Sequence, residues 1–248
     1  MKIIAGDYRQ LEVVIAAFVS RDPQLMSIVN APADSPDSDL HAQTMVSVFN
    51  IPFGEQARHP GMRVTAKTHF FSKLYGAREW TVRERLEVAA LEHPELEMTI
   101  PNVKEIGRQL RQVEKMYEGF FRTYVPLITT LARERGGVAH TAFGRPRIIP
   151  ALMSNDKGER ETAERETVSH TVQGTASDIV RKAMLGVNCL EHGRMIIQNH
   201  DEIVCEVDDQ WVEWYMERME AIMTLGQPLG GVELRVKVKS GDNWEECH

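Results

Sequence analysis

The sequence predicts an α+β fold, in which one antiparallel unit carries a helical insertion. An apolar run over Lys2–Gly6 predicts a strand at the start of the chain. A long helical middle follows it. Two apolar runs that flank four polar residues within 195–207 then predict a hairpin, with Asn199 to Glu202 at its tip.

The first half of the insertion contains short helices separated by loops. Asp22-Pro23 opens one helix, because proline is tolerated at the first helical position. Asp39 is a typical N-cap for a helix that runs to Val48, after a loop over 31–39. The sequence also predicts helices over Leu11–Phe18 and Gly61–Gly76.

The second half predicts longer elements. Asn102 caps a helix expected to reach Tyr124, where Pro126 bends or restarts it. A hairpin is expected around Gly144-Arg145-Pro146, and a helix over Thr162–His192 with an interruption near Gly174. The remaining expected elements are an irregular stretch over 91–101, a helix over Trp211–Leu225 and a strand over Val232–Val238.

Composition excludes several classes of protein. The 248 residues are 42% hydrophobic and 26% charged, typical of a globular chain with a core. No apolar run approaches the roughly 20 residues of a membrane helix, and the N-terminal run is too short for a signal peptide. Three cysteines without a CxxC pair exclude a zinc ribbon and a disulfide scaffold. We therefore expect a cytoplasmic protein with no membrane partner.

The net charge of −7 hides an uneven distribution. Residues 201–248 hold 12 acids and 4 bases, so the rest of the chain is slightly basic. Residues 58–85 hold seven bases and two acids. A local basic patch is what phosphate binding requires, so the acidic total is no argument against a nucleic-acid partner.

Asp7 and Asp201 each stand at the end of a predicted strand. If the hairpin pairs with the first strand, the two carboxylates converge and can hold hard divalent ions through oxygen. Aspartate is also favoured in turns, so these two positions alone are explained as well by turn formation.

A basic and aromatic stripe follows the helix predicted over Gly61–Gly76. Arg63, Lys67, Phe71 and Tyr75 are spaced by four, which places them along one helix face. The cations could hold a polyphosphate and the aromatic rings could stack on a base. The alternative is an ordinary amphipathic helix with buried rings and solvated cations.

The stripe belongs to a set of six segments that resembles family A DNA polymerases, the group of bacterial DNA polymerase I. "MRVTAKTHFFSKLYG" is similar to the family motif R-x3-K-x-x-x-F-G-x-x-Y-G. "GDYRQLEVVIAAF" is similar to D-Y-S-Q-I-E-L-R, and "QNHDEIVCEV" to the V-H-D-E motif. The others are "SDLHAQTMVSVF", "TAFGRPRIIP" and "ERETVSHTVQGTASDIVRKAM". All six occur in the family's order and span nearly the whole chain.

The resemblance implies an antiparallel-sheet palm with helical fingers, in a right-hand architecture that lacks the thumb. Residues 1–50 would be palm, with the first catalytic motif and the helices after it. Residues 51–160 would be mainly fingers. Residues 161–248 would be palm again, with a helix, the catalytic hairpin and the C-terminal strand.

The resemblance also implies a metal site for two Mg²⁺ ions, which Mn²⁺ could replace. The ligands would be the carboxylates of Asp7 and Asp201 and the backbone carbonyl of Tyr8. Glu202 would lie beside them. With Lys67, these acids form the expected catalytic set.

Other matching positions are assigned to the substrates. The incoming dNTP would be bound by Gln10, Leu11, Glu12, His41, Arg63, Lys67, Phe71 and Tyr75. In that set, Glu12 closes the space of a ribose 2′-hydroxyl, Phe71 packs on the sugar and base, and Tyr75 stands by the templating base.

Primer–template DNA would be contacted by a third set. Arg165, Gln173 and His200 would reach the minor groove near the primer end. Arg145 and Arg147 would contact the DNA backbone. The reaction implied is nucleotidyl transfer, in which the primer 3′-hydroxyl attacks the α-phosphate and pyrophosphate leaves.

Several positions depart from the family pattern. Arg9 stands where the first motif has Ser, and Val14 where it ends in Arg. Ser72 replaces a glycine of the basic helix, which puts template handling in question. His69 and His170 match no family role, and we expect both to be structural.

The chain begins almost at the first catalytic motif. We therefore expect the C-terminal half of a split polymerase, with a second polypeptide that carries the thumb, the remaining palm and an exonuclease. A phage genome, acting in a host cell, is one setting compatible with such a split. Two alternatives stay open: a non-catalytic DNA-binding or protein-interaction relative, and a two-metal nuclease or phosphohydrolase. The nuclease would leave the basic helix unexplained.

Overall fold

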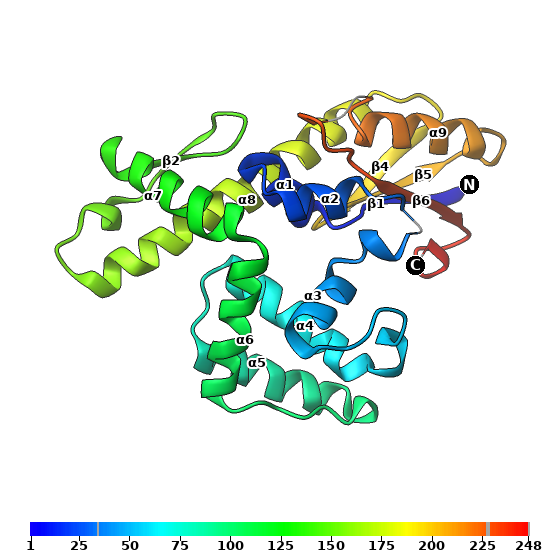
Figure 1. The fold of residues 1–248 in the computed structure, drawn as a ribbon. Helices are drawn as coiled ribbons and strands as arrows, with labels where there is room; N and C mark the ends of the chain where they lie inside the picture. The colour runs from blue at the N-terminus through cyan, green and yellow to red at the C-terminus, as the bar shows by residue number, and fades with distance from the viewer. Residues whose placement is uncertain (34, 227–228, 248) are drawn as a thin grey trace. The chain divides into compact units, whose positions relative to one another are not determined.

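The structure is a computed structural model that describes residues 1–33, 35–226 and 229–247 (Figure 1). The chain divides into two compact units. Unit 1 is Met1–Val19, His140–Pro146 and His170–His248, and unit 2 is Ser20–Ala139 and Arg147–Ser169.

Unit 1 is built on a four-stranded antiparallel sheet with the strand order β4-β5-β1-β6 (Figure 1). The strands are β1 (Lys2–Tyr8), β4 (Gly193–Asn199), β5 (Glu202–Val207) and β6 (Val236–Gly241). The predicted first strand and hairpin are confirmed. The last strand starts later than predicted, because Val232 forms an isolated bridge with Leu229 before the chain reaches the sheet.

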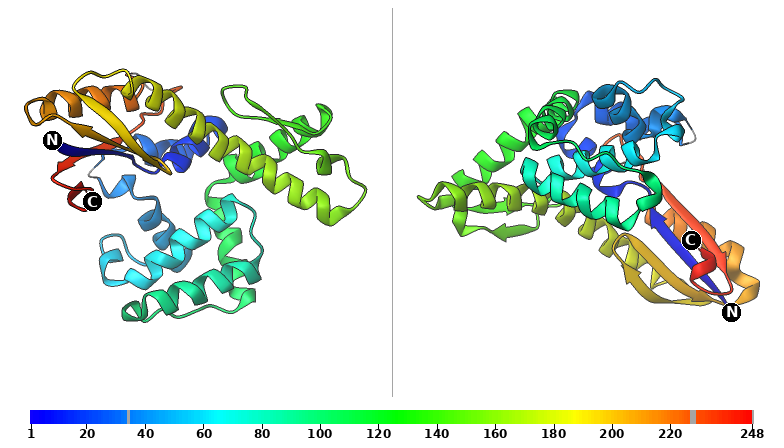
Figure 2. Two further views of the ribbon diagram at one scale, coloured as in Figure 1. Left: turned by 180° about the vertical axis from the view of Figure 1, so that it is seen from behind. Right: turned by 90° about the horizontal axis from the view of Figure 1, so that it is seen from below.

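Helix α9 (Val212–Met223), orange in Figure 2, covers one face of this sheet. A Cβ atom on Gly6 would lie 2.7 Å from the Met223 sulfur, so only glycine lets the helix approach this closely. The Tyr8 hydroxyl donates to the Met223 carbonyl at 2.8 Å. Because strand side chains alternate, Asp7 points to the opposite face, where Ala5 packs with Val204 and Cys247.

Helix α1 (Leu11–Ser20) follows β1, and helix α8 (Lys157–Val187) precedes β4. The expected interruption of α8 at Gly174 is wrong, since the helix is continuous there. A Cβ on Gly174 would lie 2.8 Å from Thr141 Cγ2 and 3.3 Å from Arg145 Nη2. The glycine therefore allows the 140–146 segment to pack closely against α8, and it does not break the helix.

Unit 2 is mainly helical. Its helices are α2 (Pro23–Asn30), α3 (Leu40–Phe49), α4 (Pro60–Leu74), α5 (Glu79–Glu92), α6 (Val103–Met116), α7 (Val125–Glu134) and the first turns of α8. The N-caps predicted at Asp39 and Asn102 are confirmed, and so is the helix that opens at Asp22-Pro23. Asp22 caps that helix by accepting two backbone N–H bonds, a role that was not predicted.

The single helix expected from Asn102 to Tyr124 is wrong. Helix α6 ends at Met116, and a π-helix over Gly119–Tyr124 leads into α7. Pro126 has no N–H to continue an α-helical ladder, and the wider π turn accommodates that gap. Helix α5 has no counterpart among the predicted elements, because it buries only Val82 and Leu86.

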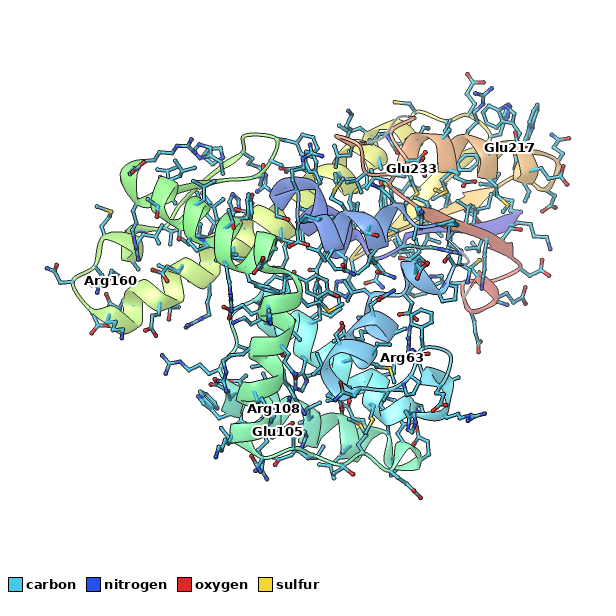
Figure 3. All side chains as sticks on the ribbon, viewed as in Figure 1. Arg63, Glu105, Arg108, Arg160, Glu217 and Glu233 are labelled. Atoms are coloured by element: carbon cyan, nitrogen blue, oxygen red, sulfur yellow. The ribbon has the colours of Figure 1, made fainter. Side chains whose placement is uncertain are left out.

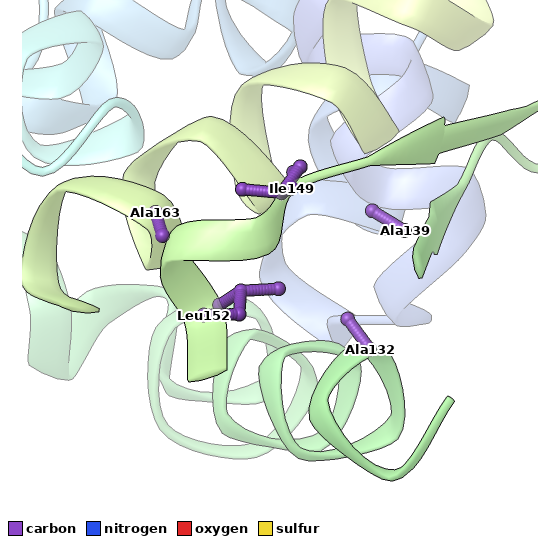
Figure 4. Close-up of a cluster of buried hydrophobic side chains, with 5 residues drawn as sticks. All are labelled: Ala132, Ala139, Ile149, Leu152 and Ala163. Atoms are coloured by element: carbon purple, nitrogen blue, oxygen red, sulfur yellow. The ribbon is translucent and has the colours of Figure 1, made fainter. Parts of the chain in front are cut away.

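A two-stranded ribbon of β2 (Val138–His140) and β3 (Pro146–Ile148) confirms the predicted second hairpin. Beside it, a small core joins side chains from α7, the ribbon and α8 (Figure 4). The members are Ala132, Ala139, Ile149, Leu152 and Ala163. No helix in the described part of the chain is long and apolar enough to cross a membrane.

Candidate active site

Two acidic residues that are distant in sequence meet at one end of the unit 1 sheet. Asp7 lies at the exposed end of β1, and Asp201 lies in the tight turn between β4 and β5. Asp7 is directly opposite Glu202 in the β1–β5 register, and the Tyr8 N–H faces the Asp201 carbonyl at 3.4 Å. The backbones of Asp7 and Asp201 are therefore one residue out of register on neighbouring strands.

Glu202 differs from Asp7 in its surroundings. It is 4% exposed, and its Oε2 accepts a hydrogen bond from Trp244 Nε1 at 3.1 Å. Directly opposed residues of an antiparallel pair share one face, so Glu202 and Asp7 lie on the same side of the sheet. Trp244 was not predicted as part of the site, because no spacing links it to the hairpin.

The donor set at this sheet end suits Mg²⁺. Asp7, Asp201 and the Tyr8 carbonyl offer only oxygen, the donor this hard cation prefers. Among the described residues, no three His, Cys, Asp or Glu side chains gather into a metal-binding group.

The segment after β1 turns sharply into α1. Gln10 has a φ of +51°, and its carbonyl accepts from the N–H groups of Val13 and Val14 at 2.9 and 3.0 Å. Leu11 is buried. Glu12 accepts a hydrogen bond from Gln173 Nε2 at 3.3 Å. The structure thus brings together a predicted sugar-selecting residue and a predicted DNA-contacting residue within unit 1.

Arg145 is tied into unit 1 by its guanidinium group. Its Nε donates to Asp178 at 2.6 Å and its Nη2 to the Gly174 carbonyl at 2.9 Å. His170 Nε2 lies 3.1 Å from the Arg145 carbonyl, which gives His170 the structural position expected for it. His200 is exposed in the β4–β5 turn with a φ of +53°. Contacts of Arg145 and His200 with DNA stay predictions.

In unit 2, the basic stripe of α4 is anchored at its N-terminal end. Arg63 Nη1 donates to Asp39 Oδ2 at 2.6 Å, and Arg63 projects from α4 (Figure 3). Asp39 Oδ1 also accepts from His41 N and Ala42 N at 3.0 Å each. Partial burial alone would raise the pKa of Asp39, but the Arg63 hydrogen bond and charge hold it below its usual value.

His41 lies against this charged group. Burial, and then the positive charge of Arg63, lowers the pKa of His41 to about 4, although Asp39 opposes the shift. Among the described residues, no group hydrogen-bonds its buried Nδ1. The ring lies 6.1 Å from the Phe71 ring, centroid to centroid. His41 is therefore neutral near pH 7.

Further along α4, Lys67 is exposed, while Phe71 and Tyr75 are half-buried. Ser72 is buried and accepts from Arg85 Nη1 at 3.0 Å. His69 is buried and lies 2.8 Å from both the Thr65 carbonyl and Gln109 Oε1, as expected for a structural histidine.

A cavity of about 370 Å³ lies at the C-terminal end of α4 within unit 2. Tyr75, Gly76 and Arg165 line it together with Glu161 and Glu164. A Cβ on Gly76 would lie 2.8 Å from Arg165 Cγ, and the φ of +64° also favours glycine there. Two predicted site residues, Tyr75 and Arg165, therefore meet at one cavity. Arg147 is instead exposed and lies 3.5 Å from Glu166.

Residues 1–246 match the sequence profile described as DNA polymerase family A. The chain belongs to this family. It is 30% identical over 261 residues to DNA polymerase I of Pseudomonas aeruginosa, covering 100% of this chain and 25% of that protein. It is 31% identical over 247 residues to the thermostable DNA polymerase I of Thermus caldophilus, covering 98% of this chain and 27% of that one.

A solved structure agrees with these relatives. The POL domain of Pol1 from M. smegmatis, in complex with DNA primer-template and dNTP, matches with a TM-score of 0.81 and 27% identity. The match covers 100% of this chain and 40% of that one. The comparison confirms the predicted polymerase fold, with helices and an antiparallel sheet. The chain spans about a quarter of the length of the polymerase I relatives.

Proposed function

We propose that this chain carries out template-directed DNA synthesis by transferring dNMP to a primer 3′-hydroxyl with two Mg²⁺ ions. The observation that carries the proposal is the register of β1 and β5. It sets Asp7 opposite Glu202 and next to Asp201 at one exposed sheet end. A carboxylate pair of this kind suits divalent ions that activate an attacking oxygen and stabilise a leaving one.

In this proposal one group of residues binds the metal ions and another binds the phosphates. Asp7, Asp201 and the Tyr8 carbonyl hold the ions, which when bound would supply positive charge to the reacting phosphate and the attacking oxygen. Arg63 and Lys67 neutralise the triphosphate and the pyrophosphate that leaves. Such catalysis consists mostly of positioning and charge neutralisation.

The other predicted roles are kept as part of the proposal. Neutral His41 lies beside Arg63 and Phe71, where it would touch the phosphates without adding repulsion between cations. Glu12, with Gln10 and Leu11, would exclude ribonucleotides. Arg165, Gln173 and His200 would follow the primer–template duplex.

We also propose that the palm comprises 1–50 and 161–248, that 51–160 is mainly fingers, and that a second polypeptide completes the enzyme. The support for a second polypeptide is the length of the relatives, about four times that of this chain. In this proposal the second polypeptide would carry the thumb, the remaining palm and an exonuclease.

Primer extension tests the function. With Mg²⁺, dNTPs and a labelled primer–template, wild type supplemented with a candidate partner should extend the primer. Asp7→Ala and Asp201→Ala should each lose at least about a thousandfold in rate, since electrostatic groups at a reacting centre contribute several kcal/mol.

Glu217→Gln is the matched control, because it removes one exposed acid from α9 in the same unit (Figure 3). It should extend at the wild-type rate. Extension that survives Asp7→Ala would contradict the catalytic role of Asp7, and no extension by wild type under any condition would favour a non-catalytic relative. Equal extension with and without the partner would contradict the split arrangement.

A further inference from the structure

Beside Asp7, the unit 1 sheet carries a set of basic residues that no predicted role uses. Lys237 of β6 is directly opposite Asp7, and Lys239 is opposite Ala5. The N–H of Arg9 donates to the Arg235 carbonyl at 2.8 Å, so Arg235 continues the same pairing. Opposed residues, and residues two apart on a strand, share a face. Lys237, Lys239 and Arg235 therefore project from the face that carries Asp7, and Arg9, which is opposed to Arg235, lies on the same side.

The basic groups crowd one another. Lys237 and Lys239 are two residues apart on β6, so their side chains are neighbours on the face that carries Asp7. Lys237 itself is exposed, so an anion in solution can reach it. A group of like charges held this closely becomes more stable when a negative ligand binds.

The required ligand carries several negative charges within a small volume. A DNA phosphodiester carries one negative charge per phosphate. One such charge is fewer than the two positive charges of the neighbouring lysines. Pyrophosphate, or the terminal phosphates of a triphosphate, offers several charges to the same amines, and Arg9 can add a bidentate contact. The position beside Asp7 is also where the proposed reaction would release pyrophosphate.

We propose that Arg9, Lys237 and Lys239 form a pyrophosphate-binding site on the Asp7 face of the sheet, which holds either the free product or the terminal phosphates of the nucleotide. The proposal rests on the proposed function only for the placement of the reacting phosphates at Asp7. It gives unit 1 phosphate-binding residues of its own, in addition to Arg63 and Lys67 proposed for unit 2.

Calorimetric titration of the 248-residue chain with sodium pyrophosphate, in Mg²⁺ at low salt and without DNA, tests the site. Lys237→Gln/Lys239→Gln should bind pyrophosphate at least about tenfold more weakly, because two charge-assisted contacts are lost. Lys237→Arg/Lys239→Arg should stay within about threefold of wild type. The control Lys104→Gln/Lys182→Gln removes two exposed lysines elsewhere and should bind like wild type.

The same titration with dATP separates the two sources of the phosphates. Loss for both ligands would assign the site to the terminal phosphates of the nucleotide. Loss for pyrophosphate alone would assign it to the released product. If the double variant is unfolded by circular dichroism, Lys237→Gln alone replaces it, with a loss of at least about threefold expected.

Unchanged pyrophosphate affinity in Lys237→Gln/Lys239→Gln would overturn the proposal, and so would an equal loss in the control. Weakened binding of duplex DNA with unchanged pyrophosphate affinity would also overturn the proposal. It would indicate that Lys237 and Lys239 contact the DNA backbone instead. Failed primer extension with intact pyrophosphate binding would count against the proposed function alone.

Discussion

At the residue scale, burial separates the acids of the candidate site. Asp7 is exposed at the end of β1, whereas Glu202 is buried and accepts a hydrogen bond from Trp244. An exposed carboxylate can exchange water for a metal ion at little cost, and a buried one is fixed by its partner. We therefore propose that Asp7 and Asp201 would bind the metal ions and that Glu202 positions the hairpin.

Glu12 provides a test of sugar selection. Glu12→Ala should raise the ratio of ribonucleotide to deoxyribonucleotide incorporation at least about tenfold, because the side chain proposed to fill the 2′ space is removed. The measurement is single-nucleotide incorporation of a matched rNTP and dNTP by the reconstituted enzyme.

Gln173→Ala is the control for Glu12, since it removes the 3.3 Å hydrogen bond but keeps the carboxylate. Its selectivity should change much less than that of Glu12→Ala. Unchanged selectivity in Glu12→Ala would rule out the steric role.

His41 links protonation to stability. Its pKa in the folded chain, about 4, is below the ordinary value of 6.5, so the unfolded chain binds the proton more tightly. The unfolding free energy should therefore fall as the pH drops from about 6.5 towards 4. The fall should reach roughly 3 kcal/mol at full protonation, as the size of the shift implies.

Urea unfolding of wild type and His41→Gln between pH 8 and pH 4 gives the unfolding free energy of each as a function of pH. The difference between the two curves is the contribution of His41 protonation. Glutamine does not titrate, so the shared loss from carboxylates cancels. Parallel profiles would show that His41 is not the group responsible.

At the element scale, a single capping residue joins two segments of unit 2. Asp22 is 2% exposed, and its Oδ1 caps α2 through the N–H groups of Gln24 and Leu25. Its Oδ2 accepts from the Phe120 N–H at 3.2 Å, at the start of the π-helix. A Cβ on Gly119 would lie 2.8 Å from that oxygen, so the contact requires glycine there.

Asp22→Ala should lower the unfolding free energy by about 2–3 kcal/mol, the sum of a lost cap and a buried N–H without its acceptor. Thermal or urea unfolding checks it. Asp37→Ala, at an exposed position in a short turn, should cost much less. An equal cost in both variants would show that the bond to Phe120 contributes nothing.

Elements with local signals were predicted well. The helix start at Asp22-Pro23, the caps at Asp39 and Asn102 and the hairpin at the Asp201 turn depend on residues close in sequence. Helix α5 and the π-helix before α7 were not predicted. Helix α5 has too few buried apolar residues to produce a helical periodicity in the sequence. The π-helix depends on packing against Asp22, a residue distant in sequence.

At the scale of the whole molecule, the charge of −7 is a poor guide to the site. The acids concentrate in the last 48 residues, yet that same segment supplies Lys237 and Lys239 beside Asp7. The alternation that predicted a last strand over Val232–Val238 covered Lys237 and ended just before Lys239, without indicating what either lysine faces. A local register, and not the net charge, decides where an anion can bind.

The sequence by itself determined the family resemblance, most of the strands and helices in their order, the helix caps at Asp39 and Asn102, and the acids and bases that the resemblance proposes for the site. These depend on residue type and short spacing. Only the tertiary structure decided that Asp7 pairs with Glu202 on one side and Lys237 on the other, that Glu12 meets Gln173, and that Trp244 holds Glu202. Strand pairing and side-chain contact between distant segments depend on how the whole core packs, and no short window of sequence contains that information.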